Sequence, residues 1–312
     1  MTMNFYSPEG RRVYCNENRK WLSSPLTLTE AKSKEIILEA IALMCDSEHN
    51  LIVDLGCMQG IIKRNEGAVG IEEGKVRDIA LISRVGKSVC FTVEQIKTDA
   101  SGKFYAELSR KRAQEKCIEE YLKLQKSGRI IDARVTHLES FGAFCDVGCG
   151  IIALLPIDAI SVSRISHPKD RFSVGDDIKA IIKSVDPDYR ITLSHKELLG
   201  TWEENAENFS EGQTVTGIIR SVESYGVFVE LAPNLAGLAE YREDVYPGQT
   251  AAIYIKSIIP EKMKIKLIII DSHDAPKEII PLEYFIDTEN TTHIDSWTYS
   301  PPGCKKIIES IF

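Results

Sequence analysis

The feature that most constrains this chain is an internal repeat. The stretch VTHLESFGAFCDVGCG begins at Val135, and a similar stretch, IRSVESYGVFVELAPN, begins at Ile219. Each continues into a V-G-D or P-G-Q turn and two strand-like runs, DIKAIIKSV and RITLSH in one copy and TAAIYIKSI and KIKLII in the other. A fainter copy begins at Met44. Three copies in order indicate tandem small units rather than one large domain.

Each copy has about five short runs with β-branched residues in alternation and glycine at the turns, which is typical of strands. Five short strands in a unit of about 65–75 residues must close on themselves to hide their edges, and this predicts a small barrel. Between the copies, residues 110–124 and 195–209 place apolar side chains at three- and four-residue intervals. That period predicts two linking helices.

We therefore expect a mainly β fold of three tandem five-stranded barrels joined by α-helical linkers. The expected boundaries are an N-terminal extension at 1–33, a degenerate barrel at 34–110, a linker helix at 111–126, a barrel at 127–195, a second linker helix at 196–210, a third barrel at 211–271 and a C-terminal extension at 272–312. The C-terminal extension is rich in aromatic residues, so we expect it to pack on a barrel.

Alternation along the second strand of the two clearer copies separates inner from outer side chains. The expected inner residues are Ala143, Cys145 and Val147 in the middle copy and Val227, Val229 and Leu231 in the third. The expected outer residues are Phe144 and Asp146 in the middle copy and Phe228 and Glu230 in the third. Phe141 and Tyr225 stand just before these strands.

Outward aromatic residues expose apolar surface without structural benefit, but they suit stacking on unpaired bases, which contributes roughly 1–3 kcal/mol per base. The last strand of each copy adds outward cations that suit phosphate contacts: Arg190 in the middle copy, and Lys264 and Lys266 in the third. A lone outward ring is often covered by a neighbouring element, and a lone cation is usually only solvated. Their recurrence in register favours a binding face.

The segments FGAFCDVGCG and VGDDIKAIIKSVDPDYRITLSHK resemble the S1 RNA-binding domain family, an OB-fold repeat named after a bacterial ribosomal protein. The resemblance covers about 35–271 and implies OB-fold barrels that bind RNA. In the middle copy it implies RNA contacts at Phe141, Phe144, Asp186 and Arg190, with Pro156 where the family has a histidine. In the third copy it implies contacts at Tyr225, Phe228 and Lys264, with Glu240 and Pro260 at the family's histidine and aspartate positions.

In the first copy, His49 and Ile52 align with the family's aromatic residues and Tyr105 with its arginine. The fold signature survives there while the binding residues do not. We therefore expect the first barrel to dock on protein, and the small ribosomal subunit is the partner that the resemblance suggests.

Charge and motif content limit the other function classes. The chain has 38 basic and 46 acidic residues, a net charge of −8, which disfavours recruitment of nucleic acid by bulk charge. The eight cysteines are scattered without a CxxC pair, and we expect reduced, buried thiols in a cytoplasmic protein. We find no spaced metal ligands, no cofactor loop, no catalytic triad motif and no apolar run long enough to span a bilayer. We expect no catalytic residues, no cofactor and no metal.

The sequence thus predicts a non-catalytic, monomeric protein that binds single-stranded RNA, mRNA in particular, during translation. One alternative is a protein-interaction scaffold that docks on a ribosome or a nuclease. Another is an RNA-processing accessory, because such barrels also occur in polynucleotide phosphorylase and exonuclease-type ribonucleases.

Overall fold

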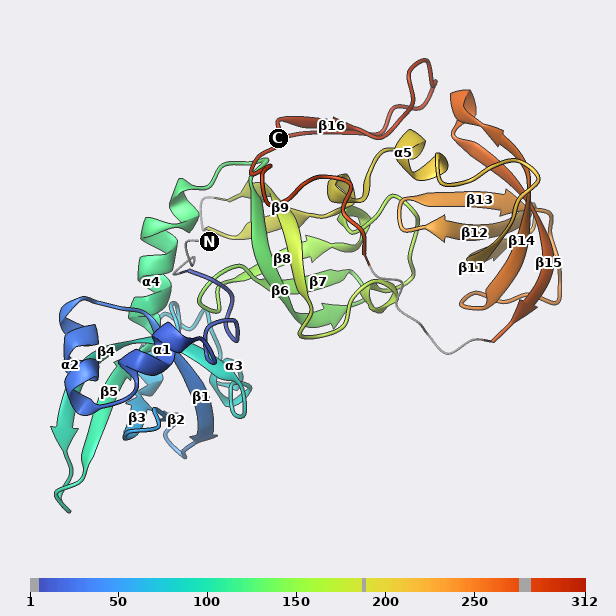
Figure 1. Cartoon of the computed structure of the whole chain (residues 1–312). Coiled ribbons are helices and arrows are strands. Elements are labelled where there is room, and N and C mark those ends of the chain that lie inside the picture. The colour runs from blue at the N-terminus through green and yellow to red at the C-terminus, as the bar shows by residue number, and fades with distance from the viewer. Residues whose placement is uncertain (1–5, 187–188, 275–281) are drawn as a thin grey trace. The chain divides into compact units, whose positions relative to one another are not determined.

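The computed structural model describes residues 6–186, 189–274 and 282–312 (Figure 1). Residues 1–5 and 275–281 of the expected terminal extensions lie outside the described residues. The chain divides into two compact units. The first holds the residues up to 125 together with 132–134 and 146–152, and the second holds the remainder.

The strands form three closed five-stranded barrels, which confirms the predicted fold class. The first contains β1 (Leu38–Cys45), β2 (Leu51–Asp54), β3 (Gln59–Ile62), β4 (Ser88–Thr98) and β5 (Phe104–Ser109). The second contains β6 (Ile130–Glu139), β7 (Gly142–Asp146), β8 (Ile152–Pro156), β9 (Asp177–Val185) and β10 (Ile191–Ser194). The third contains β11 (Thr214–Glu223), β12 (Gly226–Ala232), β13 (Leu235–Ala239), β14 (Thr250–Ile259) and β15 (Lys264–His273).

All three barrels close in the same way. The fifth strand of each runs parallel to the third, in the pairs β3–β5, β8–β10 and β13–β15. In the first and third barrels the other neighbouring strands are antiparallel. A five-stranded barrel of this topology is the OB-fold, whose outer face carries oligonucleotides in many proteins.

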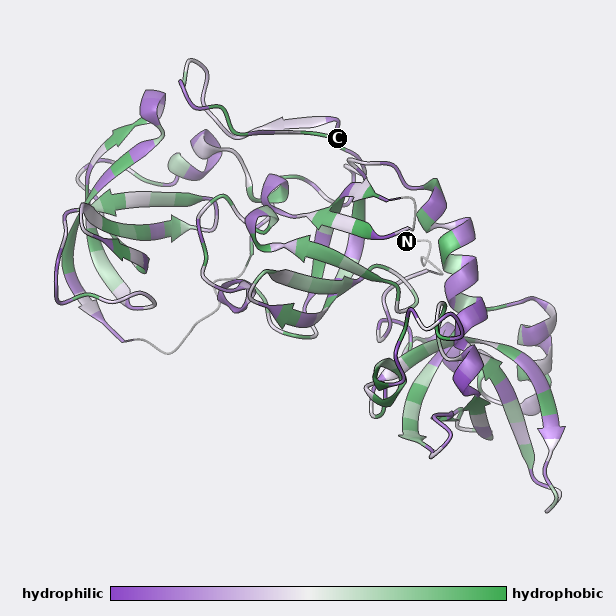
Figure 2. Ribbon diagram, turned by 180° about the vertical axis from the view of Figure 1, so that it is seen from behind, coloured by the Kyte–Doolittle hydropathy of each residue, from purple (hydrophilic) through white to green (hydrophobic). Residues whose placement is uncertain are grey.

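The cores follow the period of two along each strand (Figure 2). In the third barrel Val227, Val229, Ile253 and Ile255 are fully buried, and β15 alternates between buried and exposed positions from Lys264 onward. Long first strands bend into the barrels at register shifts, for example between Ile219 and Ser221. Such bulges let one strand serve two sides of a small barrel.

The C-terminal segment contributes to these cores. Trp297 and Tyr299 join the core cluster of the third barrel, on β16 (Ser296–Thr298) and just after it. β16 pairs with β17 (Glu309–Ile311) in a two-stranded sheet. Tyr284 and Phe312 pack against a second cluster that includes residues of the second barrel.

The linkers differ in how helical they are. α4 (Arg110–Glu120) begins where Ser109 accepts a hydrogen bond from the Arg112 N–H, and a short 3-10 turn at Leu122–Leu124 follows it. The second linker is not the continuous helix expected over 195–209. It is a 3-10 turn, η5 (Lys196–Leu199), followed by α5 (Trp202–Ala206).

The break in the second linker has a local cause. Gly200 has a φ of 80°, outside the helical region, and an added Cβ would lie 2.7 Å from the Phe285 ring. Thr201 then caps a new helix: its hydroxyl accepts from the Glu204 N–H, and the Glu204 carboxylate accepts from the Thr201 N–H. The T-x-x-E spacing at Thr201 and Glu204 is the sequence signature of this reciprocal cap, which marks the start of a new helix.

Three further helices lie in the first unit: α1 (Asn16–Trp21), α2 (Pro25–Ser33) and α3 (Ile79–Ile82). In the described parts of the chain, no helix combines the length and the hydropathy that crossing a bilayer requires.

Candidate nucleic-acid interface

The second barrel presents a pair of aromatic rings on its outer side. Phe141 lies in the turn before β7 and is 54% exposed, while Phe144 on β7 is half-buried between the fully buried Ala143 and Cys145. The two ring centroids are 5.9 Å apart and the planes cross at 88°. We call Phe141 and Phe144 the second-barrel ring pair.

The third barrel repeats this arrangement. Tyr225 is 68% exposed, Phe228 is half-buried, their centroids are 6.1 Å apart and the planes cross at 87°. We call Tyr225 and Phe228 the third-barrel ring pair. The glycine inside each pair is fixed by packing, because an added Cβ at Gly142 or Gly226 would lie 2.5 Å from a carbonyl oxygen of the third strand.

A third ring, not anticipated from the sequence, joins the second-barrel pair. His137 on β6 stacks on Phe144 with a centroid separation of 6.3 Å and an interplanar angle of 26°. Its Nε2 lies 2.6 Å from a Glu139 carboxylate oxygen. The repeat could have revealed it, because His137 aligns with Ser221, which pairs directly with Phe228 in the third barrel.

In the third barrel the strand register places a cation in line with the rings. Phe228 pairs with Leu238 on β13, and Leu238 pairs with Lys266 on β15. Neighbouring strands are about 4.8 Å apart, so Lys266 stands about 10 Å from Phe228 along this outer row. Lys264 is also exposed, two residues earlier on β15 and on the same side.

The second barrel holds its cation differently. At the position of Lys266 it has Thr192, which pairs with Leu154 on β8. Arg190 is exposed at the turn before β10, and its N–H donates to the Asp186 carboxylate at 2.8 Å. The Asp186 N–H donates in return to the Arg190 carbonyl at 3.1 Å. Asp186 therefore shapes the turn that presents Arg190.

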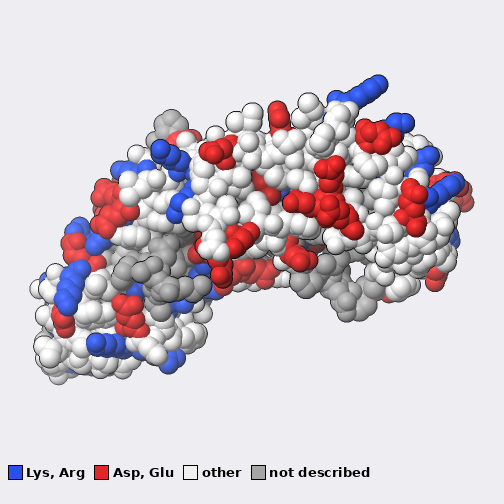
Figure 3. All heavy atoms as spheres, turned by 45° about the horizontal axis from the view of Figure 1, so that its top comes forward, with Lys and Arg blue, Asp and Glu red and all other residues white. Residues whose placement is uncertain are grey.

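The surface charge fits local rather than diffuse attraction. On the face shown in Figure 3, lysine and arginine are interspersed with aspartate and glutamate and form no continuous basic patch. A binding face on this protein has to rely on its rings and on a few placed cations.

The two outer acidic residues of the predicted pattern are not exposed. Asp146 is 1% exposed and Glu230 is 2% exposed, because other parts of the chain cover the outer side of β7 and β12 at these points. Glu230 accepts from Arg171 at 2.6 Å and from Arg220 at 2.8 Å. Both residues were predicted on the outer side of their strands, but that side is covered here, since strand parity does not report what packs outside the barrel.

Asp146 belongs to a buried ionic cluster in the first unit. The Glu9 carboxylate lies 2.7 Å from the Arg110 guanidinium and 3.2 Å from Arg84, and the Glu9 N–H donates to Asp146 at 2.8 Å. Burial and then the charge of Glu9 raise the pKa of Asp146 to about 7. Burial opposes ionisation of Glu9 as well, but the two guanidiniums bring its pKa below its ordinary value.

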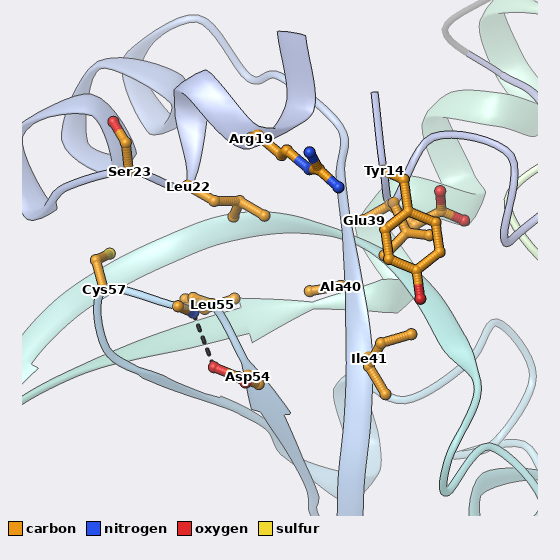
Figure 4. A pocket seen from close by; sticks show the side chains of 12 residues that line it. Tyr14, Arg19, Leu22, Ser23, Glu39, Ala40, Ile41, Asp54, Leu55 and Cys57 are labelled. Atoms are coloured by element: carbon orange, nitrogen blue, oxygen red, sulfur yellow. Dashed lines mark hydrogen bonds between the residues drawn. The ribbon is translucent and has the colours of Figure 1, made fainter. Parts of the chain in front are cut away.

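The first barrel lacks a ring pair at the repeat positions. His49 occupies a left-handed turn residue with φ 62° near the Asp78 carboxylate, and Ile52 stands where a ring would be. A pocket of about 540 Å³ opens instead between α1 and strands β1 and β2 (Figure 4). Its one ring, Tyr14, has the Arg19 guanidinium over it at 5.8 Å.

One histidine, His195, and four of the eight cysteines are buried. His195 is fully buried between the rings of Phe172 and Tyr284, and burial lowers its pKa to about 4. Four cysteines are buried and four are partly exposed, and all are free thiols. Among the described residues, no group of three or more potential ligands is arranged to hold a metal ion.

Residues 124–196 match the family S1 RNA binding domain. Small ribosomal subunit protein bS1 of Staphylococcus aureus (strain COL) is 31% identical over 187 residues, which are 56% of this chain and 46% of that protein. The bS1 homolog of Bacillus subtilis (strain 168) is 31% identical over 172 residues, 51% of this chain and 45% of that protein. The chain thus spans about half the length of the curated relatives it matches.

Among solved structures, a Streptococcus pneumoniae multidomain protein with nucleic acid binding domains aligns with 74% of this chain and 72% of its own, at 15% identity and a TM-score of 0.24. GSP13 from Bacillus subtilis aligns with 22% of this chain and 55% of its own, at 25% identity and a TM-score of 0.22. Because these TM-scores are low, we base the comparison on the sequence relatives and not on the solved structures. Residues 124–196 of this chain are thus similar to the S1 RNA binding domain family and, over about half its length, the chain is similar to the bS1 proteins of the small ribosomal subunit.

Proposed function

We propose that this protein binds single-stranded RNA, mRNA in particular, on the outer faces of its second and third barrels and acts in translation. The single observation that carries the proposal is the ring pair repeated in successive barrels, at 5.9 Å and 88° in one and 6.1 Å and 87° in the other. The packing of a barrel core does not require an exposed ring pair outside the barrel. Exposed rings on successive barrels do provide surfaces on which successive bases of one strand can stack.

Stacking is the main source of affinity in this proposal. Arg190, Lys264 and Lys266 are exposed on the same barrels as the ring pairs, and the net charge of −8 leaves no broad positive field to attract RNA. Two to four phosphate contacts on a single strand correspond to a slope of log affinity against log salt of roughly −1.5 to −3. Few donors face base edges, so sequence preference is weak and follows stacking strength.

A titration at two salt concentrations tests this function. Labelled single-stranded RNA of mixed sequence is compared with duplex RNA and single-stranded DNA of equal length. We expect the single-stranded RNA to bind most tightly and to retain measurable affinity at the higher salt. Equal binding of duplex RNA, or a slope steeper than about −5, would overturn the stacking mechanism.

The first barrel suits a second role. It has the fold without a ring pair at the repeat positions, and the Arg110 guanidinium of the first unit is buried against the Glu9 carboxylate. We infer that it docks on protein, with the small ribosomal subunit as the partner. Co-sedimentation of the full chain with 30S particles, with and without RNase treatment, tests it: docking that survives RNase supports the inference, and complete loss contradicts it.

A further inference from the structure

The third-barrel ring pair forms one wall of a pocket rather than an open face. The pocket measures about 840 Å³, within the range of about 300–1,000 Å³ that small-ligand sites occupy. Tyr225 and Phe228 line one side, together with Arg220, Ser221 and Glu223 of β11. The opposite side comes from residues 157–166 of the second barrel and from Lys196. We call this space the junction pocket.

The walls of the junction pocket are held together by buried polar contacts within the second unit. Asn234, 1% exposed, accepts from the Val162 N–H at 2.9 Å and donates to the carbonyls of Lys196 and Gly200 at 2.8 and 2.9 Å. Arg171 and Arg220 share the buried Glu230 carboxylate. The loop that faces the rings is thus fixed in place before any ligand arrives.

The basic side chains that line the junction pocket are of two kinds: one is held in ion pairs with protein carboxylates, and the others are not. Arg220 is committed to Glu230 and lies 3.6 Å from Asp170. Arg164 and Lys196 also line the pocket, and within the described residues neither takes part in an ion pair. Arg164 comes from the second barrel and Lys196 from the linker that follows it, whereas both rings come from the third barrel.

The acidic groups of the pocket identify the ligand further. Asp158 and Glu223 line it as well, so the pocket does not suit a ligand that carries only negative charge. Carboxylates accept hydrogen bonds from base amino groups and from ribose 2′-hydroxyls, which a ribonucleotide offers together with a stacking base and a phosphate and a deoxyribonucleotide does not. The lining contains a partner for each part of a ribonucleotide.

We propose that the junction pocket is a composite nucleotide site, in which the third barrel stacks a base of single-stranded RNA, and the second barrel and the linker that follows it supply the cations for its phosphates. The proposal rests on the proposed function and deepens it. The second-barrel ring pair works as an outer face of one barrel, whereas the third-barrel pair needs both barrels. An RNA strand that enters the pocket therefore contacts residues 157–166 and Tyr225 together.

Crosslinking provides the first test. Single-stranded RNA with 4-thiouridine at one position is irradiated with the full chain, and the crosslinked peptides are mapped by mass spectrometry. We expect crosslinks in the peptide with Tyr225 and Phe228 and also in the peptide that covers 157–166. Crosslinks to the ring peptide without any to 157–166 would overturn the composite site.

Charge removal provides the second test. The double variant Arg164→Ala/Lys196→Ala is compared with Lys169→Ala/Lys183→Ala, which removes two exposed charges from the same barrel outside the pocket lining. Loss of two phosphate contacts on a single strand should flatten the salt slope by about 1.4, and the control variant should keep the wild-type slope. Equal slopes in both variants would refute the inference.

The two proposals fail in distinguishable ways. If the wild-type chain binds no RNA, the proposed function is wrong. If it binds RNA and loses affinity on Phe141→Ala/Phe144→Ala, yet Arg164→Ala/Lys196→Ala matches its control, the function stands and the composite site is wrong.

Discussion

In the first barrel the repeat positions that hold rings elsewhere carry His49 and Ile52, whereas the second and third barrels carry ring pairs of nearly the same geometry. All three barrels nevertheless close with the same strand order and the same parallel third and fifth strands. Topology is maintained by buried residues at alternate positions, and in our proposal RNA binding depends on a few outward ones. A barrel can therefore lose its ligand face without losing its fold.

The first unit holds a buried cluster of charged groups. Glu9, Arg84 and Arg110 form a buried cluster, and α4 supplies Arg110 from its first turn. Among the described residues, the ring pairs and the exposed Arg190, Lys264 and Lys266 of the other two barrels do not belong to a buried ionic cluster. We therefore expect Arg110 to stabilise the first unit and the ring pairs to bind RNA.

The largest effect is expected where that cluster is broken. Arg110→Ala leaves the Glu9 carboxylate buried with half of its neutralising charge, and breaking a buried pair costs about 3–5 kcal/mol. Hydrogen exchange of β4 and β5 measures the loss. Arg112→Ala, on the same helix with an exposed partner in Glu35, should have a much smaller effect. Similar losses in the two variants would mean that the cluster does not stabilise the first unit.

The second-largest effect is expected on RNA affinity when the residues at the ring positions are replaced. Phe141→Ala/Phe144→Ala should weaken RNA binding by roughly 2–5 kcal/mol, from about 1–3 per stacked base with allowance for non-additivity. His49→Ala/Ile52→Ala, the matched change in the first barrel, should leave affinity almost intact. Fluorescence anisotropy with a labelled single strand measures both, and equal losses would place RNA binding elsewhere.

His195 in the second unit and Asp146 in the first unit should contribute to the pH dependence of stability with opposite signs. In the second unit the pKa of His195 falls to about 4 in the folded state from an ordinary value of about 6.5, so the native protein excludes a proton that the unfolded chain binds. Stability from this group is complete above about pH 6.5 and is lost as pH falls toward 4, by about 3 kcal/mol in all. His195→Gln should flatten that dependence.

Urea unfolding followed by tryptophan fluorescence in a Trp21→Phe background reports the second unit, because Trp202 and Trp297 both lie there. In the first unit the raised pKa of Asp146 acts with the opposite sign: the native state holds a proton that the unfolded chain releases, so its contribution is lost as pH rises from about 4 to 7. A second unit that gains stability on acidification would contradict the assignment to His195.

The smallest effect is expected for a single phosphate contact. Arg190→Ala should flatten the salt slope by about 0.7 and weaken all sequences alike. Lys32→Ala, which removes an exposed charge from α2 of the first unit, should leave the slope unchanged. A change of slope in both variants would show that phosphates are bound across the whole surface.

The sequence by itself determined the repeat, the three barrels and the positions of both ring pairs. These depend on local rules: alternation along a strand, glycine at turns, and the recurrence of aromatic residues in register. Phe141 with Phe144 and Tyr225 with Phe228 lie close in the chain, so strand geometry alone brings each pair together.

Only the tertiary structure decided what covers the outer faces. Asp146 and Glu230 alternate outward as the strand period requires, yet they are buried because distant residues, Glu9 in one case and Arg171 in the other, pack over them. The junction pocket and the stacking of His137 on Phe144 likewise join segments from different strands and barrels. Strand parity fixes the side on which a residue lies, but long-range packing determines whether that side meets solvent.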